Sequence, residues 1–391
     1  MAFSFSFLCK ITLIFFRREE KRKRKTVRGH FSFFFFNFSF FLRLQNHSNS
    51  GAATIDFLPP AVCDVHASCF ETAKRALDTA KADDIGGIRK IGPSDDSAHA
   101  TGYHCAGIDS ADGSSMSRYN WHREGFVFSD GEMFDIEIPE ADKGTQQRQF
   151  QSDMQKFFAS MHDAMATNVL RAVARNLGCQ DEDWFANKLG PTDKSSQWHV
   201  KRYVPICPTD TATDDGMGHC KKEKNERNES QRERGGEKDI WLPVHTDPSL
   251  ISIVLHDAPG KREGAMGLQY QIPDPSSHQK RIWVELPWHG HAIATVLVGS
   301  VLSYITGNVF PGAKHRVVCR LPTTDEETER VAATLFVRPR GDRMLLVPPS
   351  PLLLTDTGAN SVKIRNATFN DWNARVSRNY MKGRRDPTKG S

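Results

Sequence analysis

The sequence has few of the features that mark disulfide-stabilised, zinc-binding or membrane-spanning proteins. It has eight cysteines in 391 residues and no Cys-x-x-Cys pair, which argues against a disulfide scaffold or a structural zinc module. Its mean hydropathy of −0.51 and its 38% of hydrophobic residues exclude a polytopic membrane protein. The length is enough for one large domain or two ordinary domains with a substantial core.

An excess of positive charge is also lacking outside the first 45 residues. The whole chain carries +5, from 52 Lys and Arg against 47 Asp and Glu. Residues 1–45 contain ten of those basic residues, two of the acidic ones and 13 of the 25 Phe. The other residues therefore have 42 basic and 45 acidic side chains, a net charge of −3. We expect no nucleic-acid partner, because the body of the chain has no basic excess.

The leader contains two apolar runs, around residues 3–16 and 31–44, separated by a basic block. Each run has about 14 residues, fewer than the roughly 20 that a membrane-spanning helix needs. We expect residues 1–54 to be a low-complexity leader, either disordered or a targeting segment, and the body to have no stable membrane span. The cytoplasm is the expected compartment. Organelle targeting or membrane association through residues 1–45 is the alternative.

Residues 55–185 are expected to form a helix-rich N-terminal region. Asp64 follows Pro59-Pro60 and is predicted to cap a helix, since apolar residues recur after it at helical spacing. A second helix is predicted from Phe150 to Leu177-Gly178, because glycine favours a helix C-terminus. Its apolar stripe is expected in the core and consists of Met154, Phe157, Met161, Met165, Val169 and Val173.

From Trp198 onward the hydrophobic period changes to two, as in strands. Residues 209–239 interrupt this pattern with a polar run of mixed charge, and we expect a disordered surface insertion there. A partner-binding loop is the alternative. Residues 186–391 are therefore expected to be mainly β, with a barrel or two-sheet jelly-roll core. The predicted strands are 198–206, 249–256, 281–286, 291–298, 300–306, 314–320 and 330–338.

Two His-x-acid pairs are candidate metal ligands, which is no more than chance gives for 15 His and 47 acidic residues. His245-Thr246-Asp247 stands where the polar insertion ends and a strand begins. Side chains two residues apart in an extended segment point to the same face, so His245 and Asp247 can reach one metal ion. The other pair, His122-Arg123-Glu124, lies among turn-forming residues and remains the alternative.

A third ligand must come from another strand, and His315 in the segment 314–320 is the candidate. Two imidazoles and one carboxylate on one face of an octahedron leave three positions open, as in non-haem Fe(II) oxygenases. Open positions admit an oxoacid co-substrate and O₂, whereas a structural zinc site is closed. The simpler alternative is that all three are ordinary hydrogen-bonded polar residues.

Arg330 begins the predicted strand 330–338, fifteen residues after His315. It shares one face of that strand with Ala332 and Thr334. A guanidinium at the end of a strand can hold the distal carboxylate of a dicarboxylate in a bidentate fork, while the oxoacid end chelates the metal. Arg330 is therefore the candidate anchor for the co-substrate.

The motifs of residues 198–380, taken in their order along the chain, resemble those of the catalytic domain of the isopenicillin N synthase-like, iron- and 2-oxoglutarate-dependent dioxygenases. No single motif is specific, but the ordered set is. The matching segments are Tyr203-Val204-Pro205-Ile206-Cys207-Pro208, His245-Thr246-Asp247-Pro248, Gly267-Leu268-Gln269, Trp283-Val284-Glu285-Leu286, Gly299-Ser300-Val301-Leu302, Thr306-Gly307, His315-Arg316-Val317-Val318, and Arg330 with Phe336.

This resemblance implies a double-stranded β-helix (jelly-roll) fold and the co-substrates 2-oxoglutarate and O₂. Two departures from the family pattern weaken the assignment of 2-oxoglutarate more than the assignment of iron. Ala332 replaces the serine that usually lies two residues after the arginine, and Val204 replaces a second tyrosine. Tyr203 packing in the core is an equal alternative to its contacting the co-substrate. The implied iron ligands are His245, Asp247 and His315, and the implied 2-oxoglutarate contacts are Arg330 and Tyr203.

We therefore expect an enzyme that oxidises a small organic substrate with O₂ and 2-oxoglutarate, releasing succinate and CO₂. Two alternatives remain open. One is an iron oxidase of the same fold that does not use 2-oxoglutarate, and the other is a non-catalytic metal-binding or scaffold protein. The substrate and the oligomeric state are not specified by the sequence.

Overall fold

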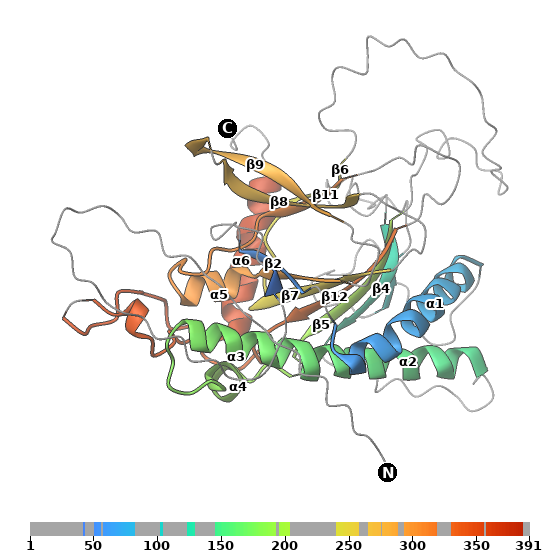
Figure 1. Cartoon of the computed structure of the whole chain (residues 1–391), viewed down its shortest axis with the longest axis horizontal. Helices are drawn as coiled ribbons and strands as arrows, with labels where there is room; N and C mark the ends of the chain where they lie inside the picture. Colours follow the sequence, from blue (N-terminus) through green and yellow to red (C-terminus); the bar gives the residue numbers. More distant parts are fainter. Residues whose placement is uncertain are drawn as a thin grey trace, which may run out of the picture.

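The structure of the chain is a computed structural model (Figure 1). The residues that it describes are 42–43, 51–55, 58–82, 102–104, 123–129, 145–192, 195–203, 240–257, 265–274, 276–287, 293–318, 330–355 and 357–385.

Two antiparallel sheets face each other and form the jelly roll, so the predicted fold class is confirmed. The major sheet has the order β1-β2-β10-β7-β12-β5-β4-β3 and the minor sheet the order β6-β11-β8-β9. The strands of the major sheet are β1 (Leu42–Arg43), β2 (Ala52–Ile55), β3 (Gly102–His104), β4 (Arg123–Ser129), β5 (Gln197–Tyr203), β7 (Ile251–His256), β10 (Ala294–Val298) and β12 (Arg330–Val337). Those of the minor sheet are β6 (Ile240–His245), β8 (Ala265–Asp274), β9 (Ser277–Pro287) and β11 (His315–Val318).

Helices cover the face of the major sheet that points away from the minor sheet (Figure 1). The helical elements are α1 (Pro60–Ala82), α2 (Thr145–Met161), the π-helix η4 (His162–Ala166), α3 (Thr167–Asn176), α4 (Trp184–Leu189), α5 (Ser300–Ile305), the 3₁₀ turn η7 (Pro351–Leu353) and α6 (Phe369–Arg385). None of the helices that the structure describes is long and apolar enough to cross a membrane.

Trp198 on β5 is the centre of the helix-facing core. Its indole is fully buried and stacks on Phe128 of β4 with ring centroids 5.3 Å apart. Phe157 and Phe158 of α2 contact it edge-on at 6.0 and 6.3 Å. Edge-to-face and offset pairs at such distances are the favoured geometries for aromatic rings. This cluster therefore fixes α2 on the sheet.

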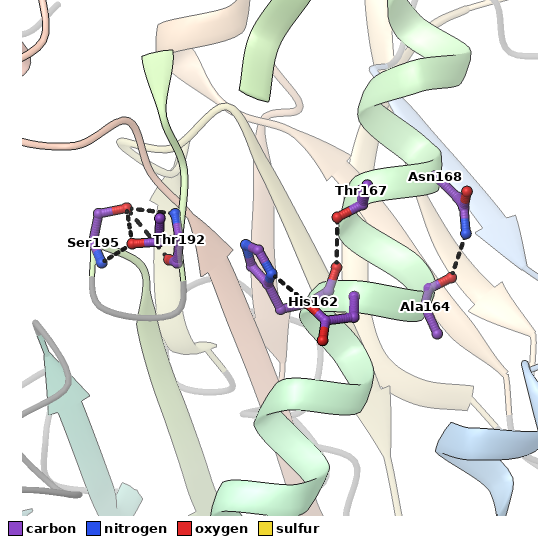
Figure 2. A network of polar contacts seen from close by, with 7 residues as sticks. His162, Ala164, Thr167, Asn168, Thr192 and Ser195 are labelled. Carbon is purple, nitrogen blue, oxygen red and sulfur yellow. Dashed lines mark hydrogen bonds and ion pairs between the residues drawn. The ribbon is translucent and has the colours of Figure 1, made fainter. Parts of the chain in front are cut away.

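The π-helix η4 keeps the apolar stripe of the long helix on one face. From Met161 to Val173 the stripe recurs every four residues, which exceeds the 3.6-residue period of an α-helix and would drift around it. One wider turn absorbs the excess residue, because a π-helix bonds i to i−5. Accordingly, the backbone N–H and the hydroxyl of Thr167 both donate to the carbonyl of His162 (Figure 2). The amide of Asn168 donates to the carbonyl of Ala164.

The predicted second helix ends where expected but begins earlier. Gly178 has a positive φ of 71°, which confirms the helix end at Leu177-Gly178. The helix starts at Thr145, five residues before the predicted Phe150. All six residues of the predicted stripe are buried, so their interpretation as core is confirmed.

Two other predictions about local structure were wrong. Residues 300–306 are not a strand, because α5 occupies Ser300–Ile305 and buries Val301, Leu302 and Ile305 at helical spacing. Asp64 is not an N-cap, because α1 already begins at Pro60. Proline is favoured in the first turn of a helix, where its missing N–H costs nothing.

Several predicted features lie outside the described residues. They include the insertion 209–239, most of the leader 1–54, His122, and the sequence between Val204 and Pro208. The boundaries proposed for the N-terminal region and the catalytic domain remain predictions.

Candidate metal centre

The two sheets meet through a second, smaller apolar cluster, which we call the inner cluster. It joins inward-facing residues of both sheets, so alternate residues of the major sheet face the minor sheet while their neighbours face the helices. Its buried members are Tyr203, Val254, Leu268, Tyr270, Ile272, Leu297, Ala313, Val317 and Ala332.

The three predicted metal ligands come together beside the inner cluster. His245 ends β6 and His315 begins β11, and the antiparallel register places these two residues directly opposite each other. Their ring centroids are 4.2 Å apart. Asp247 Oδ1 lies 3.4 Å from His245 Nε2 and 3.7 Å from His315 Nε2. In the described part of the chain, this is the group of His, Cys, Asp and Glu whose ligand atoms could converge on one metal ion, with all of them within 4.8 Å of one another.

Backbone carbonyls orient both imidazoles with Nε2 toward the carboxylate. His245 Nδ1 is 2.8 Å from the carbonyl of Pro243, and His315 Nδ1 is 3.0 Å from that of Ala313. Each carbonyl accepts a hydrogen bond from Nδ1–H, so the proton of a neutral ring resides on Nδ1 and the Nε2 lone pair is available. Such a bond on the far ring nitrogen is the usual way that proteins orient a metal-binding histidine.

The protonation states of the site suit a cation. Burial lowers the pKa of His315 to about 4, so its imidazole is neutral at physiological pH. Burial alone would raise the pKa of Asp247, but the neighbouring His315, the polar contact with His245 and a hydrogen bond from Ser252 outweigh it and hold that pKa below its ordinary value. One carboxylate and two imidazoles form a donor set appropriate to a divalent transition metal.

The loop carrying Asp247 is held by the end of β10 and the start of α5. The backbone N–H and hydroxyl of Ser300 both donate to the Asp247 carbonyl, at 2.8 and 2.9 Å. Gly299 makes this close approach feasible, since a Cβ at that position would lie 1.9 Å from the carbonyl oxygen of Ser249. The motif Gly299-Ser300 therefore positions a ligand loop that is about 50 residues away in sequence.

Of the alternative pair, His122 and Glu124, the structure describes Glu124, and its role there is structural. Glu124 is fully buried, accepts a 3.0 Å hydrogen bond from the Tyr103 hydroxyl and pairs with the Arg202 guanidinium. Arg202 also pairs with Asp78 of α1, so this network ties the helices to β4 and β5. Glu124 is therefore occupied in a structural ion pair on the helix-facing side of the sheet.

The structure places the two predicted co-substrate residues opposite each other. Arg330 and Tyr203 are register partners at the ends of β12 and β5. Tyr203 is buried in the inner cluster, and so is Ala332, which stands where a serine was expected. Lys201 is an inward-facing residue of the same strand that sequence reasoning missed.

Comparison with known proteins identifies the family. Residues 197–339 match the family model of the 2OG-Fe(II) oxygenase superfamily. The chain contains a 2OG-Fe(II) oxygenase domain. The matched segment begins at β5 and ends just after β12, so it includes all three clustered ligands and Arg330. The family uses Fe(II), 2-oxoglutarate and O₂.

Solved structures of 2OG-Fe(II) oxygenases share the fold at low sequence identity. A full-length Neurospora crassa protein in complex with alpha-KG is 16% identical, with a TM-score of 0.56 over 85% of this chain and 87% of that chain. A 2OG-Fe(II) oxygenase family protein from Caulobacter crescentus is 18% identical, with a TM-score of 0.54 over 85% and 90% of the two chains. No curated protein matches the sequence significantly. Such distant likeness establishes the fold of the domain and leaves the substrate open.

Proposed function

We propose that this protein is an iron enzyme that oxidises a small organic substrate with O₂ and converts 2-oxoglutarate to succinate and CO₂. One oxygen atom of O₂ goes to succinate and the other to the substrate, which becomes hydroxylated, so atoms and electrons balance. The observation that carries this proposal is the convergence of His245, Asp247 and His315 in a family whose members use these co-substrates.

In this proposal the two Nε2 atoms and the Asp247 carboxylate hold Fe(II) on one side. Bound there, Fe(II) would activate O₂ for oxidation of the substrate. The chain's own contribution is positioning. The carbonyls of Pro243 and Ala313 keep the rings oriented, and Ser300 keeps the Asp247 loop in place. Burial of Asp247 and His315 excludes water from the ligand atoms.

Arg330 is proposed to bind the distal carboxylate of 2-oxoglutarate, with Tyr203 as a second contact. Their register pairing at the ends of β12 and β5 supports this assignment, because it places Arg330 beside Tyr203, which turns toward the minor sheet. Arg330→Ala should raise the 2-oxoglutarate concentration required for turnover, roughly 10- to 100-fold for the loss of a charged contact. An unchanged requirement would assign Arg330 to another carboxylate.

Ala332 is the observation that favours a second candidate, an iron oxidase of the same fold. The missing hydroxyl removes one expected contact to the distal carboxylate, and an oxidase would take its electrons from the organic substrate. The amount of succinate formed per product separates the two candidates. A ratio near one supports the dioxygenase, and product without succinate supports the oxidase.

The direct test does not require the substrate. Oxygenases of this type are expected to convert 2-oxoglutarate slowly even without substrate, so succinate release can be measured by mass spectrometry with purified full-length protein, Fe(II) and O₂. We expect succinate from the wild type and none above background from Asp247→Ala or His315→Ala. Lys188→Met, on the exposed face of α4, is a matched control that should behave like wild type. Equal succinate release from Asp247→Ala and wild type would refute the proposed site.

A further inference from the structure

Three side chains on the inward face of the major sheet are partly exposed. They are His199 of β5 and Thr334 and Phe336 of β12. Alternation along each strand fixes their direction, because residues beside them, such as Val200 and Leu335, pack in the helix-facing core. Every other side chain that the structure describes on the inward faces of β5, β7, β10 and β12 is buried. The space between the two sheets is therefore open beside these three residues, which we call the open wall.

The open wall is one contiguous surface. His199 and Thr334 are register partners on neighbouring strands. The rings of His199 and Phe336 have centroids 4.6 Å apart and meet edge-on, with their planes at 62°. Edge-to-face contact is a favoured geometry for two rings, so each of them restrains the other. The open wall thus presents two rings and one hydroxyl to the space between the sheets.

The open wall lies toward the metal ligands. Phe336 is the register partner of Ser252 on β7, and paired Cα atoms of antiparallel strands are about 4.5–5.5 Å apart. Ser252 in turn hydrogen-bonds the Asp247 carboxylate. Ala332, which lies between the open wall and Arg330 along β12, is buried. The opening is therefore on the metal side of the proposed 2-oxoglutarate anchor.

The composition of the open wall favours one kind of molecule. Aromatic side chains bind planar rings by stacking or by edge-on contact, and ligand pockets combine such surfaces with a few polar groups. Here the His199 imidazole and the Thr334 hydroxyl are the polar groups. None of the inward side chains that the structure describes on β5, β7, β10 and β12 is acidic. A cationic ligand would therefore find no counter-charge on this face of the sheet.

We propose, on the basis of the function proposed above, that the open wall holds the organic substrate beside the metal ligands, and that this substrate has a planar unsaturated ring and is neutral or anionic. Phe336 packs against the ring, and His199 and Thr334 form hydrogen bonds with its polar substituents. The co-substrate lies instead toward Arg330 and Tyr203. Substitutions in the open wall should therefore change the binding of ring compounds and leave the 2-oxoglutarate affinity unchanged.

The binding of four probes to the full-length protein, loaded with Mn(II) and 2-oxoglutarate, tests this proposal. Phenylacetate and cyclohexylacetate are both anions and differ in the planarity of the ring. Phenylacetamide and phenethylamine share the planar ring, and one is neutral whereas the other is a cation. The Mn(II)-induced relaxation of the probe protons measures binding next to the metal ligands.

Four variants accompany the wild type. Phe336→Leu removes the aromatic ring, and Phe336→Tyr keeps it. His199→Leu removes the polar atoms of the imidazole. Lys188→Met, on the exposed face of α4, is the surface control.

Wild type should bind phenylacetate several-fold more tightly than cyclohexylacetate, and phenylacetamide several-fold more tightly than phenethylamine. Phe336→Leu should lower the affinity for the planar anionic and neutral probes about two- to tenfold through the loss of one aromatic contact, and Phe336→Tyr should retain it. His199→Leu should lower the same affinities about two- to tenfold through the loss of a hydrogen bond. The 2-oxoglutarate affinity, measured by calorimetry, should equal that of wild type in every variant.

The proposal is overturned if wild type does not discriminate between the planar and the saturated ring, or if Phe336→Leu binds all four probes as wild type does. It is also overturned if the variants lose 2-oxoglutarate affinity instead, which would assign the open wall to the co-substrate. Mn(II) affinity, measured by electron paramagnetic resonance, should be the same in all variants and shows that the fold is retained. A wild-type protein that binds neither Mn(II) nor 2-oxoglutarate would instead refute the proposed function itself, and this inference with it.

Discussion

The two faces of the major sheet are built from alternate residues of the same strands, yet they differ in composition. On β5, Trp198 and Val200 pack against the helices in a continuous apolar core. Lys201 and Tyr203, on the other face, turn toward the minor sheet and the metal ligands. The helix-facing side therefore supplies stability, and the inward side is free to carry polar groups for ligand binding.

The polar groups on the helix-facing side have a different role from those on the inward side. Arg202 and Glu124 are buried and paired with each other, and Asp78 and Tyr103 extend the network. His245, Asp247 and His315, which belong to the minor sheet and the loop after β6, instead direct their ligand atoms to one common point. Burial of polar side chains alone thus does not identify a functional site, whereas the convergence of several metal-ligand atoms on one point does.

Trp198→Ala should have the largest effect on stability and the least effect on the metal site. Truncating a fully buried tryptophan is expected to lower the free energy of unfolding by about 3–5 kcal/mol. Urea denaturation of the metal-free protein measures this loss. Fe(II) and 2-oxoglutarate affinities of the folded variant should match those of wild type. Weaker metal binding at full stability would contradict the separation of the two faces.

Glu124→Gln should have the next largest effect, again on stability. The amide keeps the shape of the side chain but removes the charge opposite the buried Arg202, which should cost about 1.5–3 kcal/mol. Thermal unfolding monitored by circular dichroism provides the measurement. A loss of metal affinity with unchanged stability would return Glu124 to the status of a candidate ligand.

Ala332→Ser should have the smallest effect, and on the inward face. It restores a hydroxyl to the strand position two residues after Arg330, and one net hydrogen bond contributes about 0.5–1.5 kcal/mol. The 2-oxoglutarate affinity should rise roughly 2- to 10-fold, with little change in the unfolding midpoint. An unchanged affinity would place the distal carboxylate away from Ala332.

Much of the site could be predicted because its determinants are local. The two-residue spacing of His245 and Asp247 predicted that both could reach one ion, although the structure places Asp247 in the loop after β6 rather than in the strand. Their pairing with His315 depends on the register between β6 and β11, and His315 was predicted from its place in another strand and from the family resemblance. Lys201 was missed because a single lysine in a strand has no local signal of burial. Its environment is created by β4 and β12, which are distant in sequence.

The errors in secondary structure also have local causes. Residues 300–306 contain Val, Leu and Ile, which suit a short strand or a buried helical turn equally. The outcome depended on Gly299, which lets the chain cross the Asp247 loop and start α5. Strand β8 was not predicted because Gly267 and Pro273 interrupt its alternation, although it supplies Leu268, Tyr270 and Ile272 to the inner cluster.

The most direct measurement is an anaerobic titration of the metal-free, full-length protein with Fe(II) and 2-oxoglutarate, followed by visible absorbance. Chelation of Fe(II) by the oxoacid at the site of His245, Asp247 and His315 should produce a metal-to-ligand charge-transfer band that requires both additions. The band should be absent in Asp247→Ala and present in Lys188→Met. No band from the wild type, or an equal band from Asp247→Ala, would contradict the proposal that these three residues form a 2-oxoglutarate-dependent iron site.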